Sequence, residues 1–373
     1  MKITAVKTFL LQHSLPRPTG PSTYLYTSRQ SLLIKLESDE GLSGWGETSS
    51  FGGVRTLIEQ TYAPILIGQN PLEHRRLWRA LWGPNFGNGI ALGGVDIALH
   101  DLRGKALNQS IGDMYGGKLR ERVPAYASAM NYIQDVDSIE QYPDEAQAMR
   151  ARGFRAMKMR IGARPMREDL AAVAAVRAAV GPDIKLMADG NGAYTLPGAV
   201  AMGRELEKLG LYWFEEPLPQ NTPHYQGYEV LTDKLDIAIA AGEGLDSRGG
   251  FDTFINRRMA DIVQPDVSLC GGIAETLFVA ELARMRGLQC MPHCWAGAIV
   301  IAATVHVLSL LPVSSWARTS ETPMLELDMV ENPFREVILT KPLDIQDGFV
   351  AVPSGPGLGI EIDEDMVRKY QVA

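Results

Sequence analysis

Seven ionisable residues recur through the middle of the chain at intervals that match one strand-plus-helix unit. They are Lys158, Arg160, Asp189, Glu215, Glu243, Asp266 and His293. Each lies within a short apolar run or just after one, and from Asp189 onward the intervals are 23 to 28 residues. Parallel strands that each end in a polar group bring those groups to one edge, so the spacing predicts a single site.

Three of these groups are carboxylates on successive units: Asp189, Glu215 and Glu243. Carboxylates that are brought to one point repel one another unless a hard cation neutralises them. Oxygen ligands with room for water suit Mg²⁺, with Mn²⁺ as the alternative ion. The sequence offers no paired His or Cys ligands that would favour Zn²⁺.

Asp266 and His293 fall on the next two units. An aspartate beside an imidazole fixes the tautomer of the ring and raises its basicity, which makes a general base. A single histidine in a strand is more often structural, but its register with an acid one strand away favours a catalytic pair.

Lys158 and Arg160 occupy alternate positions of one expected strand, so both side chains point to the same face, the barrel interior. A buried lysine beside another cation has a lowered pKa and can act as a base, whereas an arginine binds anions and keeps its proton. A metal ion that holds a carboxylate between these groups and the His–Asp pair suits abstraction of the proton α to that carboxylate. The charges around it would stabilise the enediolate that forms.

These residues lie on short apolar strands that alternate with helices from about residue 123. The expected strands are Val123–Ala129, Ala156–Ile161, Ile184–Ala188, Leu211–Phe214, Ile237–Ala241, Asp261–Gln264, Leu288–Met291 and, as an eighth, Ser315–Thr319. The expected helices between them include Glu168–Ala179, Leu196–Leu209 and Ala274–Arg286. Seven or eight such units predict a parallel α/β barrel, which carries function at the carboxyl ends of its strands.

Residues 1–122 have a different pattern and are expected to form an α+β unit. Its expected elements are the strands Ile3–Leu11 and Ser31–Glu37 and the helices Leu57–Leu66 and Ile90–Ala106. The barrel is expected over 123–334. The segment 335–373 no longer follows the barrel period, and we expect it to return to the N-terminal unit.

The composition is that of an ordinary globular protein of 373 residues, with 46% hydrophobic and 21% charged residues. The net charge is -8 and no basic block stands out, so neither nucleic acid nor an anionic membrane is an expected partner. The apolar stretch Ala296–Leu311 carries His306 and falls inside the barrel pattern, which predicts a buried helix rather than a membrane span. Cys270, Cys290 and Cys294 form no even framework, as expected of free thiols in a reducing cytoplasm.

With these residues assembled, the sequence resembles the enolase superfamily, and within it the mandelate racemase subgroup, over nearly the whole chain. The motifs that carry the resemblance are Gly44-Trp45-Gly46-Glu47, Lys158-Met159-Arg160, Asp189-Gly190-Asn191, Trp213-Phe214-Glu215-Glu216-Pro217, Ala241-Gly242-Glu243, Gln264-Pro265-Asp266 and Met291-Pro292-His293. The resemblance implies an α+β capping domain over a modified (β/α)₇β barrel. It implies Mg²⁺ on Asp189, Glu215 and Glu243, and it makes the His293–Asp266 pair one acid/base.

The resemblance also implies a glutamate after the last strand that donates to the substrate carboxylate. We assign this role to Glu326, with Glu321 as the competing choice. Specificity in this family comes from capping-domain loops, here about Pro16–Arg29 and Thr48–Arg55, the first with the composition of a mobile lid. The expected substrate contacts, each with a plain surface or core role as the alternative, are Tyr24, Tyr26, Arg29, Asn191 and Trp295.

One departure from the family pattern bears on the reaction. The second barrel strand of the subgroup usually reads Lys-x-Lys, with the second lysine as a base, and this chain has Arg160 there. A racemase needs a base on both faces of its substrate, so racemisation is disfavoured. His293 then becomes the favoured base, with Lys158 as the alternative.

We therefore expect an Mg²⁺-dependent acid-sugar dehydratase that eliminates the β-hydroxyl through an enediolate. The first alternative is a cycloisomerase that opens a sugar-acid lactone by the same β-elimination, because the run Glu331-Asn332-Pro333-Phe334-Arg335 and the run Gly355–Gly359 resemble relatives that act on such lactones. A racemase or epimerase and a non-catalytic metabolite-binding relative are the remaining alternatives. The resemblance implies a cytoplasmic homo-oligomer, dimer to octamer.

Overall fold

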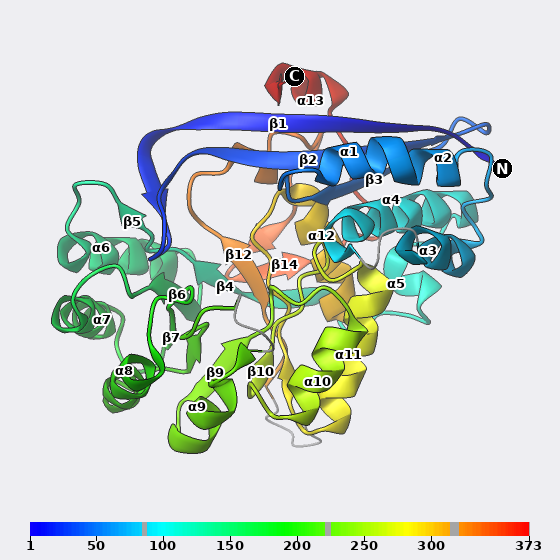
Figure 1. The fold of residues 1–373 in the computed structure, drawn as a ribbon. Coiled ribbons are helices and arrows are strands. Elements are labelled where there is room, and N and C mark those ends of the chain that lie inside the picture. Colours follow the sequence, from blue (N-terminus) through cyan, green and yellow to red (C-terminus); the bar gives the residue numbers. More distant parts are fainter. Residues whose placement is uncertain (84–87, 221–224, 314–320, 373) are drawn as a thin grey trace.

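The computed structural model describes residues 1–83, 88–220, 225–313 and 321–372 (Figure 1). A parallel α/β barrel forms the larger part, and an antiparallel sheet with its own helices lies across one end of it. Ser22 Oγ of that sheet's hairpin donates to the carbonyl of Gly190, just past a barrel strand, at 2.6 Å. The covered end is therefore the carboxyl end of the barrel strands.

The barrel consists of eight parallel strands that alternate with seven helices in the described part of the chain. The strands are β4 (Arg122–Ser128), β6 (Ala156–Arg160), β7 (Lys185–Asp189), β8 (Trp213–Glu215), β9 (Ala238–Ala241), β10 (Ile262–Val263), β11 (Gln289–Cys290) and β12 (Leu325–Asp328). The helices are α6 (Ser138–Ala151), α7 (Met166–Val180), α8 (Leu196–Lys208), α9 (Tyr228–Lys234), α10 (Arg248–Asn256), α11 (Ile273–Met285) and α12 (Ala298–Leu310). This element order is that of a (β/α)₇β barrel, as the resemblance implied.

The seven strands predicted over Val123–Met291 are all found, with ends within two residues of the expected ones. The eighth predicted strand, Ser315–Thr319, lies outside the described residues. The eighth strand that the structure describes is β12, which pairs in parallel with β4. Its register places Glu326 opposite Tyr126, so the last strand adds a carboxylate to the barrel interior.

Side chains alternate across the strands as the periodicity predicts. Met157 and Met159 of β6 pack into the core between the barrel and its helices, whereas Lys158 and Arg160 point inward. A smaller apolar cluster fills the barrel below the polar end; it contains Tyr126, Ala156, Met187, Trp213, Ala240, Ile262, Met291 and Met324.

The capping unit is an antiparallel sheet with helices packed on one face. Its elements are β1 (Ile3–Gly20), β2 (Tyr26–Ser38), β3 (Ser43–Thr48), α1 (Val54–Leu57), a π-helical turn (Ile58–Tyr62), α2 (Ala63–Leu66), α3 (His74–Trp82), α4 (Gly89–Leu107) and α5 (Ile111–Met114). The long helix α4 lies directly on β3, where a Cβ at Gly46 would collide with the carbonyl of Gly94. This close approach explains the glycines of the Gly44–Glu47 run.

The segment Pro16–Arg29, expected to be a mobile lid, is mostly a β-hairpin. Residues up to Gly20 belong to β1, which also pairs with β5 (Tyr132–Ile133) of the barrel unit, and β2 begins at Tyr26. Pairing to both strands fixes the position of the hairpin over the barrel end. The prediction of a loop was wrong because polar and glycine-rich composition does not report pairing between distant strands.

The C-terminal segment contacts both units. After a 3₁₀ turn (Pro333–Arg335), β13 (Ile345–Gln346) pairs with β14 (Phe349–Ala351), and β14 pairs antiparallel with β4 of the barrel. The chain ends with α13 (Glu364–Tyr370) and β15 (Gln371–Val372), and β15 pairs with β1. The expected return to the N-terminal unit is thus seen for the last elements.

The apolar stretch Ala296–Leu311 contains the last barrel helix, α12, whose residues up to Ser309 are buried. Among the described helices, none has the length and apolarity needed to cross a membrane. The three cysteines, Cys270, Cys290 and Cys294, are free and buried.

His306 of α12 provides a test of this packing. Its Nε2 lies 3.1 Å from the carbonyl of Leu358, and burial lowers the pKa of the imidazole to about 4. The unfolded chain binds this proton near pH 6.5, so between pH 6.5 and 4 the unfolded state holds more protons. The free energy of unfolding should therefore fall as the pH drops through this window, by up to about 3 kcal/mol.

We expect His306→Gln, whose amide can still donate to Leu358, to lose this contribution. Urea unfolding of both proteins at several values between pH 7 and 4.5 measures the difference. An equal pH dependence in the two proteins would contradict a buried, neutral His306.

Candidate active site

The predicted polar residues meet at the carboxyl end of the barrel. In the sheet register Arg160 on β6 pairs with Asp189 on β7, and Asp189 pairs with Glu215 on β8. Glu243, Asp266 and His293 follow the next three strands, two or three residues after each strand ends. The structure therefore brings together the seven residues on which the sequence analysis began.

Lys158 lies at the centre of this cluster. Its Nζ donates to Glu215 Oε1, and it lies 2.7 Å from Glu326 Oε1 and 3.5 Å from Asp189 Oδ2. Burial lowers the pKa of Lys158, but Glu215 and Glu326 raise it by more, so the net shift is upward. The expectation of a lowered pKa was wrong, because the surrounding carboxylates outweigh the single neighbouring cation Arg160.

The other oxygen of Glu215 is also held. Glu215 Oε2 accepts hydrogen bonds from Trp213 Nε1 and from Gln264 Nε2, each at 2.9 Å. Both donors lie in motifs that the sequence analysis quoted, but neither was given a role. They fix the orientation of the Glu215 carboxylate inside the barrel.

Arg160 contacts several oxygens at the same end of the barrel. Its Nη1 donates to Asp189 Oδ2 and lies 3.3 Å from Asn191 Oδ1, and its Nε donates to Asn131 Oδ1 at 3.3 Å. The backbone N–H of Asn191 donates to Asp189 Oδ1 at 2.9 Å. The guanidinium of Arg160 also lies over the ring of Trp295, 4.9 Å from the centroid. Arg160 is thus placed to contact an anion and is not free to act as a base.

His293 and Asp266 form the predicted pair. His293 Nδ1 lies 2.7 Å from Asp266 Oδ2, while Asp266 Oδ1 accepts from the N–H and the Oγ of Ser268, both at 2.7 Å. Burial lowers the pKa of His293, but the charges of Glu243 and Glu326 and the hydrogen bond to Asp266 raise it to about 10. This environment stabilises the imidazolium, which is the form of His293 once Nε2 holds a proton.

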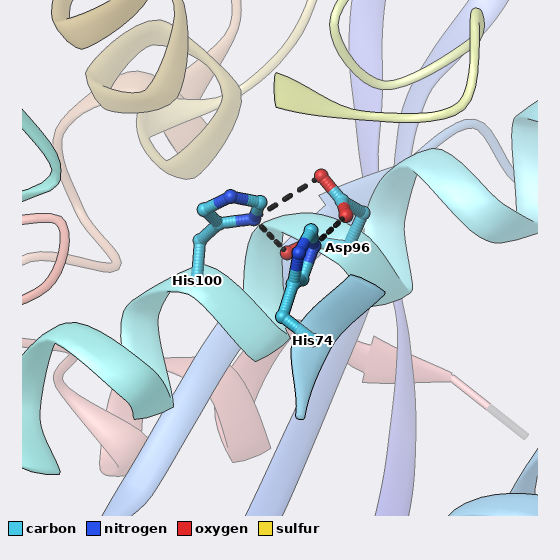
Figure 2. A group of neighbouring side chains, drawn as sticks. All are labelled: His74, Asp96 and His100. Atoms are coloured by element: carbon cyan, nitrogen blue, oxygen red, sulfur yellow. Dashed lines mark hydrogen bonds and ion pairs between the residues drawn. The ribbon is translucent and has the colours of Figure 1, made fainter. Parts of the chain in front are cut away.

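Glu243 faces His293, whereas the other two proposed metal ligands, Asp189 and Glu215, face Lys158. Glu243 Oε2 lies 3.2 Å from His293 Nε2, whereas Asp189 and Glu215 both contact Lys158. Lys158 attracts Asp189 and Glu215, and His293 attracts Glu243. The three carboxylates also repel one another. Within the described residues, the three-residue group whose ligand atoms all lie within 4.8 Å of one another is a different one, His74, Asp96 and His100 of the capping unit (Figure 2).

The structure separates the two candidate glutamates near the last strand. Glu326 is fully buried beside Lys158 and accepts from the backbone N–H of Cys294 at 3.2 Å. Glu321 pairs with Lys185 at 2.6 Å and accepts from the Tyr212 hydroxyl, at the amino-terminal ends of β7 and β8. Glu321 is therefore at the opposite end of the barrel, and its assignment to the substrate was wrong.

The cations around Glu326 favour its ionised form. Burial raises its pKa, but Lys158, His293 and Arg160 lower it by more, so the net shift is downward. An ionised carboxylate accepts hydrogen bonds and cannot donate one. The structure thus places Glu326 where the resemblance implied, with the proton state of an acceptor.

Two arginines enclose Trp295 beside this cluster. Arg29 and Arg160 each lie 4.9 Å from its ring centroid, and Arg29 also pairs with Asp328 at 2.5 Å. Tyr26, not Tyr24, faces inward: its hydroxyl accepts from Arg29 Nη1 at 3.1 Å, whereas Tyr24 is 62% exposed. Arg29, Tyr26 and Trp295 therefore lie together beside the cluster, and the Tyr24 ring lies at the surface, 6.2 Å from the ring of Tyr26.

Asn131 is a residue that sequence reasoning missed. It follows β4, contacts Arg160 and donates to the Tyr26 hydroxyl at 3.2 Å. It also lines a cavity of about 330 Å³ between β1 and α6, together with Thr19, Glu145 and Met329. Its position just after the first barrel strand was the available signal, since the other polar residues were found in the same way.

Comparison with known proteins agrees with this geometry. Residues 141–366 match the family model described as Enolase C-terminal domain-like, and residues 5–116 match the Mandelate racemase / muconate lactonizing enzyme, N-terminal domain. The chain therefore belongs to the mandelate racemase/muconate lactonizing enzyme family of the enolase superfamily. Within that superfamily it is an enzyme of the lyase or intramolecular lyase type.

Two relatives match over nearly their full length. D-galactarolactone cycloisomerase of Agrobacterium fabrum is 36% identical over 378 residues, covering 100% of this chain and 99% of the relative. Arabinonate dehydratase of Saccharolobus solfataricus is 33% identical over 349 residues, covering 91% of this chain and 90% of the relative.

Two solved structures share the fold. The 3,6-anhydro-D-galactonate cycloisomerase from Zobellia galactanivorans superposes with a TM-score of 0.89 at 30% identity, over 100% of both chains. A racemase from Streptomyces coelicolor A3(2) with bound magnesium has a TM-score of 0.87 at 26% identity, over 99% of this chain and 100% of the other.

The buried pair Arg29–Asp328 joins the capping sheet to the barrel beside the site and can be tested by itself. Replacement of Arg29 by Ala should lower the free energy of unfolding by about 3 kcal/mol, because it leaves a buried carboxylate without its closest cation. Lys7→Ala is the matched control, since Lys7 pairs with Glu37 at 2.8 Å but is half exposed. Denaturant unfolding of both variants measures the difference; equal losses would contradict a structural role for the buried pair.

Proposed function

We propose that this protein removes the proton α to the carboxylate of a sugar acid and eliminates the oxygen at the β-carbon, acting as an acid-sugar dehydratase. The observation that carries the proposal is the placement of His293. Its Nδ1 is fixed by Asp266, and its Nε2 faces the cluster that holds Lys158, Glu326 and Glu243. Abstraction of an α-proton requires a base near the α-carbon and a positive charge that stabilises the enediolate, and the cluster offers both.

We propose Asp189, Glu215 and Glu243 as the ligands of Mg²⁺, with Mn²⁺ as the alternative ion. The donor set supports this: three carboxylates on successive strands, two of them already directed at one ammonium, suit a hard divalent cation. When bound, the ion would neutralise charge on the substrate carboxylate and on the enediolate.

The other residues bind and orient the substrate. Lys158 and Arg160 are placed to donate hydrogen bonds to the substrate carboxylate, and Glu326 holds Lys158 in position. Asp266 orients the His293 ring through Nδ1, so Nε2 is the nitrogen that faces the cluster and that we propose takes the α-proton. Asn191, Asn131 and Trp295 line the same end of the barrel and are candidates for contacts to the hydroxyl groups.

The proposed elimination moves one proton through His293. His293 Nε2 takes the α-proton, and the electron pair of the broken C–H bond moves into the carboxylate to give the enediolate. When the enediolate collapses, the bond to the β-oxygen breaks; that oxygen takes the proton from the His293 imidazolium and leaves as water, which restores the neutral imidazole. The resulting enol becomes a 2-keto-3-deoxy acid.

A second candidate is a cycloisomerase that opens a sugar-acid lactone by the same proton abstraction. In that reaction the leaving oxygen belongs to the lactone ring and remains attached to the product. The observation that favours it is the full-length match to D-galactarolactone cycloisomerase at 36% identity. Both reactions use His293 in the same way, so they differ in substrate and not in the proposed machinery.

Three buried free thiols support a reducing, cytoplasmic setting for either.

Substitution of His293 tests the proposed base. We expect His293→Asn to abolish turnover and α-proton exchange, by at least about 1,000-fold, because the only proposed acceptor for the α-proton is removed. Mg²⁺ binding, measured by calorimetry, should survive, since none of the proposed ligands is changed. Full activity in the variant would remove His293 from the mechanism.

A substrate panel in D₂O with Mg²⁺ separates the two candidates. Aldonic acids, aldaric acids and their lactones are followed by NMR for 2-keto product and for deuterium at the α-carbon. Consumption of an open-chain acid establishes the dehydratase, and consumption of lactones alone establishes the cycloisomerase. Deuterium uptake without net product would indicate a racemase or epimerase, and would show that Arg160 does not prevent exchange on both faces.

A further inference from the structure

One buried carboxylate of the capping unit has no place in the site described so far. Glu47, at the end of the Gly44–Glu47 run on β3, is 1% exposed. It accepts hydrogen bonds from Ser31 Oγ and the N–H of Gly297, both at 2.7 Å, and from the N–H groups of Ile299 and Val300, both at 3.2 Å. No ion pair between described residues includes it. Burial raises its pKa, and these four hydrogen bonds oppose the shift.

The three backbone donors belong to the start of α12. The first N–H groups of a helix have no acceptor within the helix, and a carboxylate there also interacts favourably with the helix dipole. Gly297 is the N-cap residue and has no side chain to fill this role, and a Cβ at this position would collide with Glu47 Oε1. A strand of the capping unit thus caps a helix of the barrel.

This helix begins five residues after the proposed base, His293. Between His293 and the helix, Cys294 donates to Glu326 at 3.2 Å, Trp295 lies between the two arginines, and the Ala296 carbonyl accepts from Asn332 at 3.3 Å. A connection this short transmits the position of the helix start to the imidazole. Two charged residues of the capping unit contact this segment: Arg29 lies over Trp295, and Glu47 accepts from the backbone at the helix start.

Asp266, the other residue of the His293–Asp266 pair, also precedes a helix whose start accepts a carboxylate from the capping unit. Asp96 of α4 accepts from the N–H of Ile273, the first residue of α11, at 2.8 Å, and α11 follows the loop that carries Asp266. Figure 2 shows His74 and His100 turned toward Asp96, with His74 Nε2 2.6 Å from its Oδ1. The group therefore serves as a cap whose carboxylate is fixed by two imidazoles.

We propose that Glu47 is a positioning residue: by capping α12 it sets the distance and angle of His293 relative to Asp266 and the substrate. This inference rests on the proposed role of His293 as the base. It assigns to the capping unit a part in the proton transfer itself, in addition to covering the barrel end.

Glu47→Gln tests the proposal, because the amide keeps the shape but replaces one acceptor with a donor that faces the N–H of Gly297. A displacement of about 1 Å at a reacting group can cost about 100-fold in rate. We therefore expect kcat to fall by about 10- to 100-fold with KM changed by less than about 3-fold. The α-deuterium isotope effect on kcat should be at least as large as in the wild type, and Mg²⁺ affinity, measured without substrate, should be unchanged.

Asp101→Asn is the matched control. Asp101 is a second buried carboxylate of the capping unit, and it accepts from the N–H of Trp45 at 2.8 Å and of Leu358 at 2.9 Å. It joins β3 to the C-terminal segment and does not contact the segments that carry His293 or Asp266. We expect a similar loss of stability in thermal unfolding, with kcat and the isotope effect unchanged.

A second variant keeps the test decisive if Glu47→Gln does not fold. Gly297→Ala keeps the Glu47 carboxylate in the protein, but the added methyl group pushes it away from the helix start. The backbone φ of -87° at Gly297 is compatible with alanine. It should reproduce the fall in kcat. If the wild type exchanges the α-proton but neither variant differs from Asp101→Asn, the positioning role is wrong while the proposed function stands. A wild type without any α-proton exchange overturns both.

Discussion

A buried ammonium among carboxylates is the interaction on which the rest of this site depends. Lys158 is 1% exposed, and an isolated charge at such a depth would cost several kcal/mol. Glu215, Glu326 and Asp189 compensate it, and each reaches it from a different strand. Their oxygens are held in turn, Glu215 by Trp213 and Gln264 and Glu326 by the backbone at Cys294. The register of the barrel strands is therefore fixed by electrostatics as well as by apolar packing, because a shift by one residue would leave these buried charges without partners.

The capping unit satisfies a second set of buried charges across its contact with the barrel. Arg29 pairs with Asp328 of the last strand, and Glu47 and Asp96 end at the first N–H groups of α12 and α11. These three contacts come from β2, β3 and α4, so the sheet of the unit contributes two and its helix layer one. Because both helices follow directly on the residues of the His293–Asp266 pair, the two parts of the molecule are coupled at the point where the chemistry is proposed to occur.

Much of this could be anticipated from local patterns. Short apolar strands spaced by helices identified seven barrel strands within two residues, and the polar residue at each strand end identified the cluster. Three expectations about surroundings were wrong: the pKa direction of Lys158, the place of Glu321, and the loop conformation of Pro16–Arg29. Each depends on partners more than 50 residues away, such as Glu215 for Lys158, Lys185 for Glu321 and Tyr132 for the hairpin.

The sequence by itself thus determined the alternation of strands and helices, the family, and the identity of the ionisable residues at the carboxyl ends. These are properties of residue order along the chain, and a period of two or 3.6 residues records them locally. Only the tertiary structure decided which charges neutralise one another, that Tyr26 and not Tyr24 faces the site, and that Glu47 caps a helix 250 residues away. The physical reason is that burial and Coulomb interactions depend on distance in space, which barrel closure and the seating of the capping unit set together.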